Sequence, residues 1–245
     1  MTPHPPVRFS LVLPTYNEAA NIERMVPSLQ EVFSAAKLAD YEIVIVDDDS
    51  PDGTGSIADS LAAASAGRVR SLRRKGERGL ATAVVAGWKT TKAPVLAVMD
   101  ADGQHPPEVV PRLLQALDRG ADVAVASRYT AGGDIPRWNV VRRLGSKFAT
   151  LLVRLALPAG VRHLRDPLSG CFALRREVIE GVELKPLGFK ILLEVLLRGR
   201  VHRLEEVPYV FAPRTGGKSK LGARVAILDA VQLLRSSWQS RRGRP

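Results

Sequence analysis

The stretch Pro94-Val-Leu-Ala-Val-Met-Asp-Ala-Asp-Gly-Gln-His-Pro-Pro-Glu108 decides the fold class of this chain. It opens with five apolar residues, a run typical of a strand that is buried on both faces of a sheet. The run ends at once in Asp100 and Asp102, and Gln104 follows two residues later. Ligands of open α/β sheets bind beyond the carboxyl ends of the strands, where two carboxylates suit a hard cation that also contacts substrate phosphates. A solvated acidic turn is the alternative interpretation of this pattern taken alone.

Apolar runs alternate with segments of helical spacing around this stretch. Strand patterns occupy residues 9–14, 41–46, 68–74 and 122–127, and helical patterns occupy residues 19–36, 55–66, 79–91 and 107–119. Either Thr15 or Asn17 could cap the first helix. The alternation predicts an α/β fold with a mostly parallel sheet, right-handed crossovers and flanking helices. No GxGxxG or P-loop is present, which disfavours dinucleotide-binding proteins and ordinary nucleoside triphosphatases.

The second half of the chain has a different pattern. Residues 138–157 predict an amphipathic helix, which could belong to the core or lie in a membrane interface. Strand patterns follow at residues 166–174 and 207–212, helical patterns at 188–197 and 221–239, and a basic loop at 214–221. We expect a disordered N-terminus over residues 1–8, one α/β domain over 9–222, and a C-terminal helix with a basic tail over 223–245.

Positive charge is concentrated in two segments of the chain. Residues 128–176 carry ten Lys and Arg against two acids, and residues 214–245 carry eight against one. Such an uneven excess suggests a polyanionic partner, either an anionic membrane or a nucleic acid. An aromatic content of 5% and the lack of a recognition module argue against nucleic acid.

Composition narrows the cellular setting. The single cysteine, Cys171, excludes a disulfide framework and is typical of a reducing compartment, where it would pack as a small apolar side chain. The N-terminus lacks the apolar core of a signal peptide, and no stretch approaches the roughly 20 apolar residues of a membrane span. We therefore expect a protein of a reducing compartment that does not cross a bilayer.

Several stretches together resemble glycosyltransferases of family 2, which have the GT-A fold, and within them the dolichol-phosphate (polyprenol-phosphate) mannose synthases. The first three matching stretches are Leu13-Pro-Thr-Tyr-Asn-Glu18, Val46-Asp-Asp-Asp-Ser-Pro-Asp-Gly-Thr54 and Met99-Asp-Ala-Asp-Gly-Gln-His-Pro-Pro-Glu108. Further matches are Ser127-Arg-Tyr129, Asp166-Pro-Leu-Ser-Gly-Cys-Phe-Ala-Leu174, Gly188-Phe-Lys-Ile-Leu-Leu-Glu194, Val207-Pro-Tyr-Val-Phe211 and the segment from Arg214 through Lys218-Ser-Lys-Leu221. Gly188–Glu194 and Ser219–Leu221 are the segments specific to the lipid-phosphate branch. Cys171, where the family often has an aromatic residue, and Lys218, where Glu is usual, depart from its pattern.

The resemblance implies a role for individual residues. A divalent cation, Mg²⁺ or Mn²⁺, would be held by Asp100, Asp102 and Gln104. The donor sugar nucleotide would be bound by Pro14, Tyr16, Glu18, Val46, Asp48, Asp100, Ala101, Arg128, Lys190, Arg214 and Lys220. The acceptor phosphate would be bound by Arg128, Arg142, Ser146 and Arg214. Asp102, Arg128 and Arg214 would be the catalytic residues. Asp52, judged from its turn-rich setting and not from the resemblance, would shape the turn or cap the helix that follows.

The resemblance also implies the reaction, namely transfer of mannose from GDP-mannose to a polyprenyl monophosphate with inversion at the anomeric carbon. A phosphate monoester is largely ionised near neutral pH, so the acceptor needs orientation more than a general base. A lipid acceptor implies a cytoplasmic protein that is peripheral on the cytoplasmic face of an anionic membrane. A separate membrane-anchoring subunit is left open, and no nucleic acid is expected as a partner. A family 2 transferase that uses UDP-glucose or another sugar nucleotide is the alternative, and a basic nucleic-acid-binding protein is a remote one.

Overall fold

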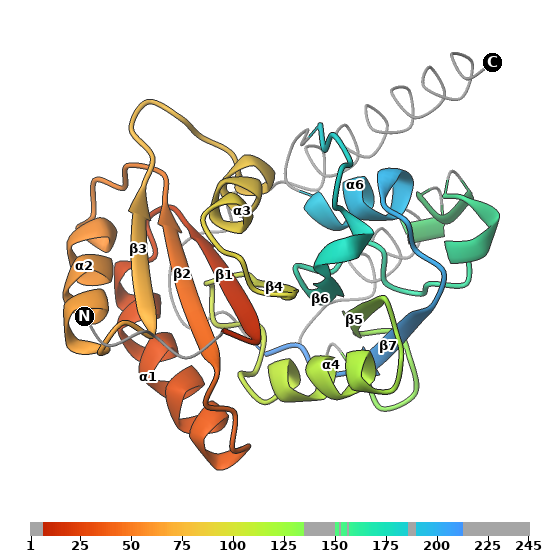
Figure 1. Cartoon of the computed structure of the whole chain (residues 1–245), viewed down its shortest axis with the longest axis horizontal. Coiled ribbons are helices and arrows are strands. Elements are labelled where there is room, and N and C mark those ends of the chain that lie inside the picture. Colours follow the sequence, from red (N-terminus) through yellow and green to blue (C-terminus); the bar gives the residue numbers. More distant parts are fainter. Residues whose placement is uncertain (1–6, 135–149, 152, 156, 186–189, 213–245) are drawn as a thin grey trace.

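The computed structural model of the chain describes residues 7–134, 150–151, 153–155, 157–185 and 190–212. In this part of the chain a seven-stranded sheet has the order β3-β2-β1-β4-β6-β5-β7 and is flanked by helices (Figure 1). The strands are β1 (Phe9–Thr15), β2 (Tyr41–Asp47), β3 (Val69–Arg73), β4 (Val95–Met99), β5 (Val123–Ser127), β6 (Cys171–Arg175) and β7 (Leu204–Pro208). The α-helices are α1 (Ala19–Ala35), α2 (Thr54–Ala64), α3 (Leu80–Lys89), α4 (Val109–Asp118) and α6 (Ile191–Arg198).

The prediction of a mostly parallel sheet is confirmed. Strands β1 to β4 run parallel, as do β5 and β7, whereas β6 lies antiparallel between β4 and β5. Strand β4 therefore ends at the same edge as its neighbour β1, and β2 ends there too. This arrangement gathers the residues that follow these three strands along one edge of the sheet.

The core has two layers because the strands are buried on both faces. In β1, the side chains of Leu11 and Leu13 pack with α1, α2 and α4 on one face. The intervening Val12 packs on the other face with α3 and α6. The period of two residues in a strand sends successive side chains to opposite faces. A nearly continuous apolar run is thus what a centrally placed strand requires.

Two strands differ from the sequence prediction. Strand β6 is confined to the last part of the predicted run at 166–174, because residues 166–170 form the turn that brings the chain back beside β4. Strand β7 ends at Pro208, whereas the predicted strand extended to residue 212. Beyond this proline, Val210 forms an isolated bridge with Asp134. No helix in the described residues is long and apolar enough to cross a membrane.

The start of helix α1 is held by the neighbouring loop. Among the described hydrogen bonds, neither Thr15 nor Asn17 caps this helix with its side chain. Instead the Asp52 carboxylate accepts hydrogen bonds from the backbone N–H groups of Ala19, at 3.2 Å, and Thr54, at 3.0 Å. Burial alone would raise the pKa of Asp52, but these hydrogen bonds lower it below its usual value. Asp52 thus accepts from the first residue of both α1 and α2, although Gly53 and not Asp52 is the residue at the N-cap position of α2.

Part of the basic segment 128–176 is used inside the fold. Arg175 donates hydrogen bonds to the carbonyl groups of Leu117, at 2.8 Å, and Ala121, at 3.2 Å, where helix α4 ends. Arg176 donates to two carbonyl groups of the connection between α3 and β4. The last carbonyl groups of a helix lack partners within the helix, and arginine satisfies them with a favourable charge. Arg175 therefore binds the last turn of α4 and the residue before β5, and Arg176 binds the connection between α3 and β4, so both arginines are used within the fold.

Candidate active site

The carboxylate of Asp100 lies directly beyond strand β4. Its backbone N–H donates to the carbonyl of Gly170 at 3.2 Å, which extends the pairing of β4 with β6. A Cβ atom at position 170 would lie 1.9 Å from Asp100 Oδ2. Glycine at this position therefore provides the space that the Asp100 carboxylate occupies.

The turn after Asp100 is tied to the segment that follows β7. Asp102 accepts a hydrogen bond from the backbone N–H of Gln104 at 3.1 Å. The side-chain Nε2 of Gln104 donates a hydrogen bond to the carbonyl oxygen of Ala212 at 3.4 Å. The backbone N–H of Ala212 donates in return to the carbonyl oxygen of Gln104 at 3.0 Å. These contacts fix the three predicted cation ligands on one turn.

The side chain of His105 is buried beneath this turn, between Asp100 and Tyr209. Its imidazole is buried, stacks on the ring of Tyr209 at 5.0 Å, and places Nε2 3.9 Å from Asp100 Oδ2. Burial lowers the pKa of His105 to about 4; Asp102 opposes this shift and Arg128 adds to it. The imidazole is therefore neutral near pH 7 and supports Asp100 without adding charge.

Arg128 follows strand β5 and forms a buried ion pair with Asp166. Its Nε and Nη2 each lie 2.7 Å from an oxygen of the carboxylate, and its backbone N–H donates to the same group at 3.0 Å. The Asp166 side chain is 0% exposed. Desolvation would lower the pKa of Arg128, but the bonds to Asp166 keep it raised. A planar guanidinium held on one edge by a carboxylate has a fixed orientation, which suits recognition of phosphate.

The amine of Lys190 completes this group of charges. It donates to the carbonyl of Leu168 at 2.9 Å and interacts electrostatically with Asp100, Asp102, Arg128 and Asp166. Burial lowers its pKa; the charge of Asp100 opposes the shift and that of Arg128 adds to it. Three carboxylates and two cationic groups thus converge beyond β4 and β5. We refer to these residues as the charge cluster, namely Asp100, Asp102, Arg128, Asp166 and Lys190.

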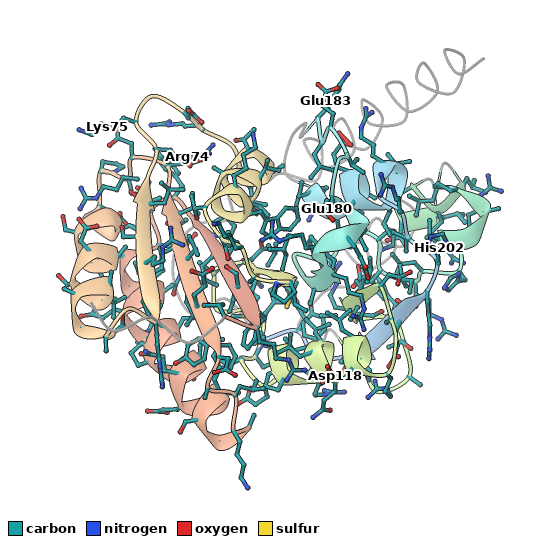
Figure 2. All side chains as sticks on the ribbon, viewed as in Figure 1. Arg74, Lys75, Asp118, Glu180, Glu183 and His202 are labelled. Carbon is teal, nitrogen blue, oxygen red and sulfur yellow. The ribbon has the colours of Figure 1, made fainter. Side chains whose placement is uncertain are left out.

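A second group of predicted residues lies beyond strands β1 and β2. Both carboxylate oxygens of the buried Asp48 are hydrogen bonded, to Arg74 Nε at 2.7 Å and to the backbone N–H of Gly79 at 2.8 Å. The Arg74 guanidinium also donates to Glu77, at 3.0 Å, and to Thr82, at 3.1 Å. Asp48 therefore anchors the loop between β3 and α3, where Figure 2 labels Arg74 and Lys75.

Tyr16 and Glu18 lie between this loop and helix α1. The guanidinium of Arg78 lies 4.6 Å from the centre of the Tyr16 ring. The Glu18 carboxylate accepts from the side chain of Asn21 at 2.6 Å, and its backbone N–H donates to Thr54 Oγ1 at 2.9 Å. The remaining residues predicted to bind the donor here, Pro14 and Val46, pair with each other one residue before the ends of strands β1 and β2. Ala101 directly follows Asp100.

Sequence reasoning missed two partners that orient predicted site residues. Asp166 holds Arg128, and Arg74 holds Asp48. Asp166 lay within a matched motif, but nothing in the spacing indicated which cation it would meet. Four predicted residues lie outside the described part of the chain, namely Arg142, Ser146, Arg214 and Lys220.

The cation site was predicted from two carboxylates and one amide. Within the described ranges, no group of three or more His, Cys, Asp or Glu side chains is arranged to hold a metal ion. Oxygen ligands from Asp100, Asp102 and Gln104 are nevertheless of the type that Mg²⁺ and Mn²⁺ prefer, and such ions commonly take few protein ligands together with substrate phosphates. The excess of carboxylates over cationic groups in the charge cluster also favours a bound cation. The residues fit a divalent cation shared with a ligand.

Comparison with known proteins agrees with this architecture. The model of glycosyl transferase family 2 matches residues 10–182. Dolichol-phosphate mannosyltransferase of Pyrococcus furiosus is 47% identical over 88% of this chain, which spans 59% of that protein. Polyprenol monophosphomannose synthase of Mycolicibacterium smegmatis is 37% identical over 90% of this chain and 83% of its own length. The Saccharomyces cerevisiae dolichol-phosphate mannosyltransferase is 36% identical over 93% of this chain and 86% of its own length.

Solved structures share the fold at low sequence identity. Mannosyl-3-phosphoglycerate synthase of Rubrobacter xylanophilus has a TM-score of 0.71 at 21% identity, over 97% of this chain and 76% of that one. A mannosyltransferase of Pyrobaculum calidifontis, solved with GDP-Man and Mn²⁺, has a TM-score of 0.64 at 18% identity, over 98% of this chain and 66% of that one. Fold, family match and relatives agree over most of the chain. The chain therefore belongs to glycosyl transferase family 2 and has the GT-A fold.

Proposed function

We propose that this chain transfers mannose from GDP-mannose to a polyprenyl monophosphate and produces polyprenyl β-D-mannosyl phosphate. The observation that carries the proposal is the charge cluster, which collects three carboxylates and two cationic side chains at the edge of the sheet where nucleotide ligands of α/β folds bind. The names of the three relatives, which are all polyprenyl-type phosphate mannosyltransferases, support the choice of substrates.

The reaction exchanges one phosphate oxygen for another at the anomeric carbon of mannose. An oxygen of the polyprenyl phosphate forms the new bond to this carbon while the bond to the β-phosphate of GDP breaks on the opposite side, so the configuration inverts. The acceptor is already ionised near neutral pH, because its second pKa is about 6. The enzyme therefore needs no group that removes a proton. Burial lowers the pKa of His105 to about 4, which makes this imidazole a weak base near neutral pH and agrees with this requirement.

The residues of the charge cluster have distinct tasks in this proposal. Asp100 and Asp102, with Gln104, would hold a divalent cation. Bound there, this cation would neutralise the diphosphate leaving group. The guanidinium of Arg128, oriented by Asp166, would align a phosphate group of the donor or the acceptor. Lys190, which belongs to the same cluster, would bind the donor sugar nucleotide.

Transfer of labelled mannose from GDP-mannose to a short polyprenyl phosphate tests this function directly. We expect a mannosyl lipid with Mg²⁺ or Mn²⁺, no product with a chelator, and a loss of at least a hundredfold in Asp102→Ala. Asp118→Ala is the matched control, because Asp118 is an exposed carboxylate at the end of helix α4 (Figure 2). Turnover of UDP-glucose without turnover of GDP-mannose would refute the donor and support the alternative transferase. Formation of an α-linked product would refute inversion.

We also propose that the protein is peripheral on an anionic membrane, on its cytoplasmic face. At the end of the predicted interface helix, Leu151 and Leu155 are 51% and 62% exposed, whereas Val153 and Leu157 between and after them are buried. Two exposed leucines one helical turn apart form an apolar stripe that suits the boundary between lipid headgroups and chains. The rest of this helix, residues 138–149, lies outside the described part of the chain.

Binding to vesicles tests the membrane proposal. We expect the protein to bind vesicles that contain anionic lipid more tightly than neutral ones, and to be released by high salt, because the attraction of Lys and Arg falls with ionic strength. Replacement of both Leu151 and Leu155 by glutamate should weaken this binding at least tenfold. Val210→Glu is the control, since Val210 is an equally exposed apolar side chain elsewhere. Unchanged binding of the double variant would refute the role of these leucines.

The roles of residues outside the described ranges remain part of the same proposal. Arg142, Ser146 and Arg214 would bind the acceptor phosphate, and Arg214 and Lys220 the donor. Individual alanine variants should raise KM for the substrate that each residue binds, with Arg214→Ala also lowering kcat. We further propose that residues 9–222 form the catalytic domain, residues 1–8 a disordered N-terminus, and residues 223–245 a helix with a basic tail that contacts the membrane or a membrane-anchoring subunit.

A further inference from the structure

The loop that connects β3 to α3, residues 74–79, brings an additional cation to the nucleoside side of the site (Figure 1). Its two ends are fixed by Asp48, which binds Arg74 at one end and the backbone N–H of Gly79 at the other. Gly76 and Gly79 have φ values of +71° and +137°, which side-chain-bearing residues rarely adopt. This backbone turns the loop so that Arg78 reaches the ring of Tyr16.

Arg78 differs from the other charged groups of this loop. Glu77, its neighbour, pairs with Arg74 at 3.0 Å. In the described part of the chain, no carboxylate forms a salt bridge with Arg78, whose exposed guanidinium lies 4.6 Å from the centre of the Tyr16 ring. Both oxygens of Asp48, which the family resemblance assigns to the nucleoside, are already hydrogen bonded to the loop. Arg78 is thus an exposed cation of this loop that contacts the Tyr16 ring.

We infer that Arg78 reads the base of the donor nucleotide and selects guanine over uracil. The inference rests on the proposed function, since it assumes that the nucleoside of the donor lies at Tyr16. Guanine presents two neighbouring acceptors, O6 and N7, to which the planar fork of arginine donates two parallel hydrogen bonds. Uracil has a single acceptor, O4, on the corresponding edge, as thymine does. The same side chain would thus bind GDP more tightly than UDP.

Binding of GDP and of UDP to the wild-type protein and to Arg78→Ala, measured by calorimetry with Mg²⁺ present, tests the inference. We expect Arg78→Ala to weaken GDP binding about tenfold to a hundredfold, the range for loss of one bidentate contact to a base. Binding of UDP should change less than threefold. Arg78→Lys should also lose most of the preference for GDP, because an ammonium keeps the charge but not the fork. Lys75→Ala is the matched control, since Lys75 is an exposed cation of the same loop.

The outcomes separate this inference from the proposed function. An equal loss of GDP and UDP binding in Arg78→Ala would show that Arg78 contacts the phosphates or shapes the loop, and would overturn the inference. Unchanged GDP binding, or full selectivity in Arg78→Lys, would also overturn it. None of these results would refute the proposed function, because the wild-type protein could still transfer mannose from GDP-mannose. A wild-type protein that binds UDP but not GDP would instead refute the proposed donor together with the inference.

Discussion

Replacement of Gly170 by alanine tests whether the position of Asp100 limits activity. A Cβ atom at this position would lie 1.9 Å from Oδ2 and 2.5 Å from Cγ of Asp100. Atoms in ordinary contact are about 3.5 Å apart, so the carboxylate must move by roughly 1.5 Å. The φ angle of Gly170 is not in the left-handed region, so alanine fits the backbone itself.

This substitution should separate activity from stability. Asp100 is a partly exposed side chain that can rotate away at little cost, so we expect the free energy of unfolding to fall by no more than about 1 kcal/mol. A displacement of about 1 Å at a reacting centre costs on the order of a hundredfold in rate. We therefore expect kcat/KM of mannosyl transfer to fall about a hundredfold, and the affinity for Mn²⁺ in the presence of GDP to fall with it.

The measurements are transfer kinetics, chemical denaturation and titration with Mn²⁺, each with Gly160→Ala as the control. A Cβ atom at position 160 would meet no atom within 4 Å, so this variant should behave as the wild type. If Gly170→Ala kept activity within threefold of the wild type, the carboxylate would not need its observed position, and its proposed role in cation binding would be refuted. A variant that failed to fold would contradict the assumption that Asp100 can move freely.

Three further predictions concern buried groups of the fold. Asp166→Asn should lower the free energy of unfolding by about 3–5 kcal/mol, because it leaves the buried charge of Arg128 without its counter-ion; a loss below 1 kcal/mol in urea denaturation would contradict the geometry. Burial raises the pKa of the Cys171 thiol, so it should react with a thiol reagent only under denaturing conditions; rapid modification of the native protein would show that the site opens. Arg175→Ala should destabilise the protein by about 1–3 kcal/mol, since the carbonyl group of Ala121 loses the guanidinium and that of Leu117 keeps the N–H of Gly120 but loses the guanidinium. Vesicle binding should be unchanged, and a parallel loss of it would assign Arg175 to the membrane surface instead.

Local patterns in the sequence were sufficient for most of the sheet. Strands β1, β2 and β4 are apolar runs bounded by turn residues, and a run buried on both faces needs this composition wherever it lies. The order of the strands and the reversed direction of β6 could not be read in this way. Both are set by contacts between residues far apart in the chain, such as those of β6 with β4 and β5.

In the candidate site, too, some residues could be identified from the sequence, whereas their partners could be identified only from the structure. Asp100 and Asp102 were identified because their position after a buried strand is a local property of the sequence. The partners of Arg128 and Asp48 were not, since Asp166 lies 38 residues from Arg128 and Arg74 lies 26 residues from Asp48 along the chain. A carboxylate in the sequence does not reveal which cation it will meet.

The sequence by itself thus determined the fold class, the family and the residue types at the edge of the sheet, because apolar periodicity and short motifs act over a few neighbouring residues. Only the tertiary structure decided which of those side chains contact one another through hydrogen bonds, ion pairs and ring contacts. It showed Asp48 bound to the loop at Arg74 and Gly79, and it brought Arg78 to Tyr16 across 62 positions of the chain. The physical reason is that ion pairs and ring contacts depend on distance in space, which the packing of the sheet and its crossover loops sets.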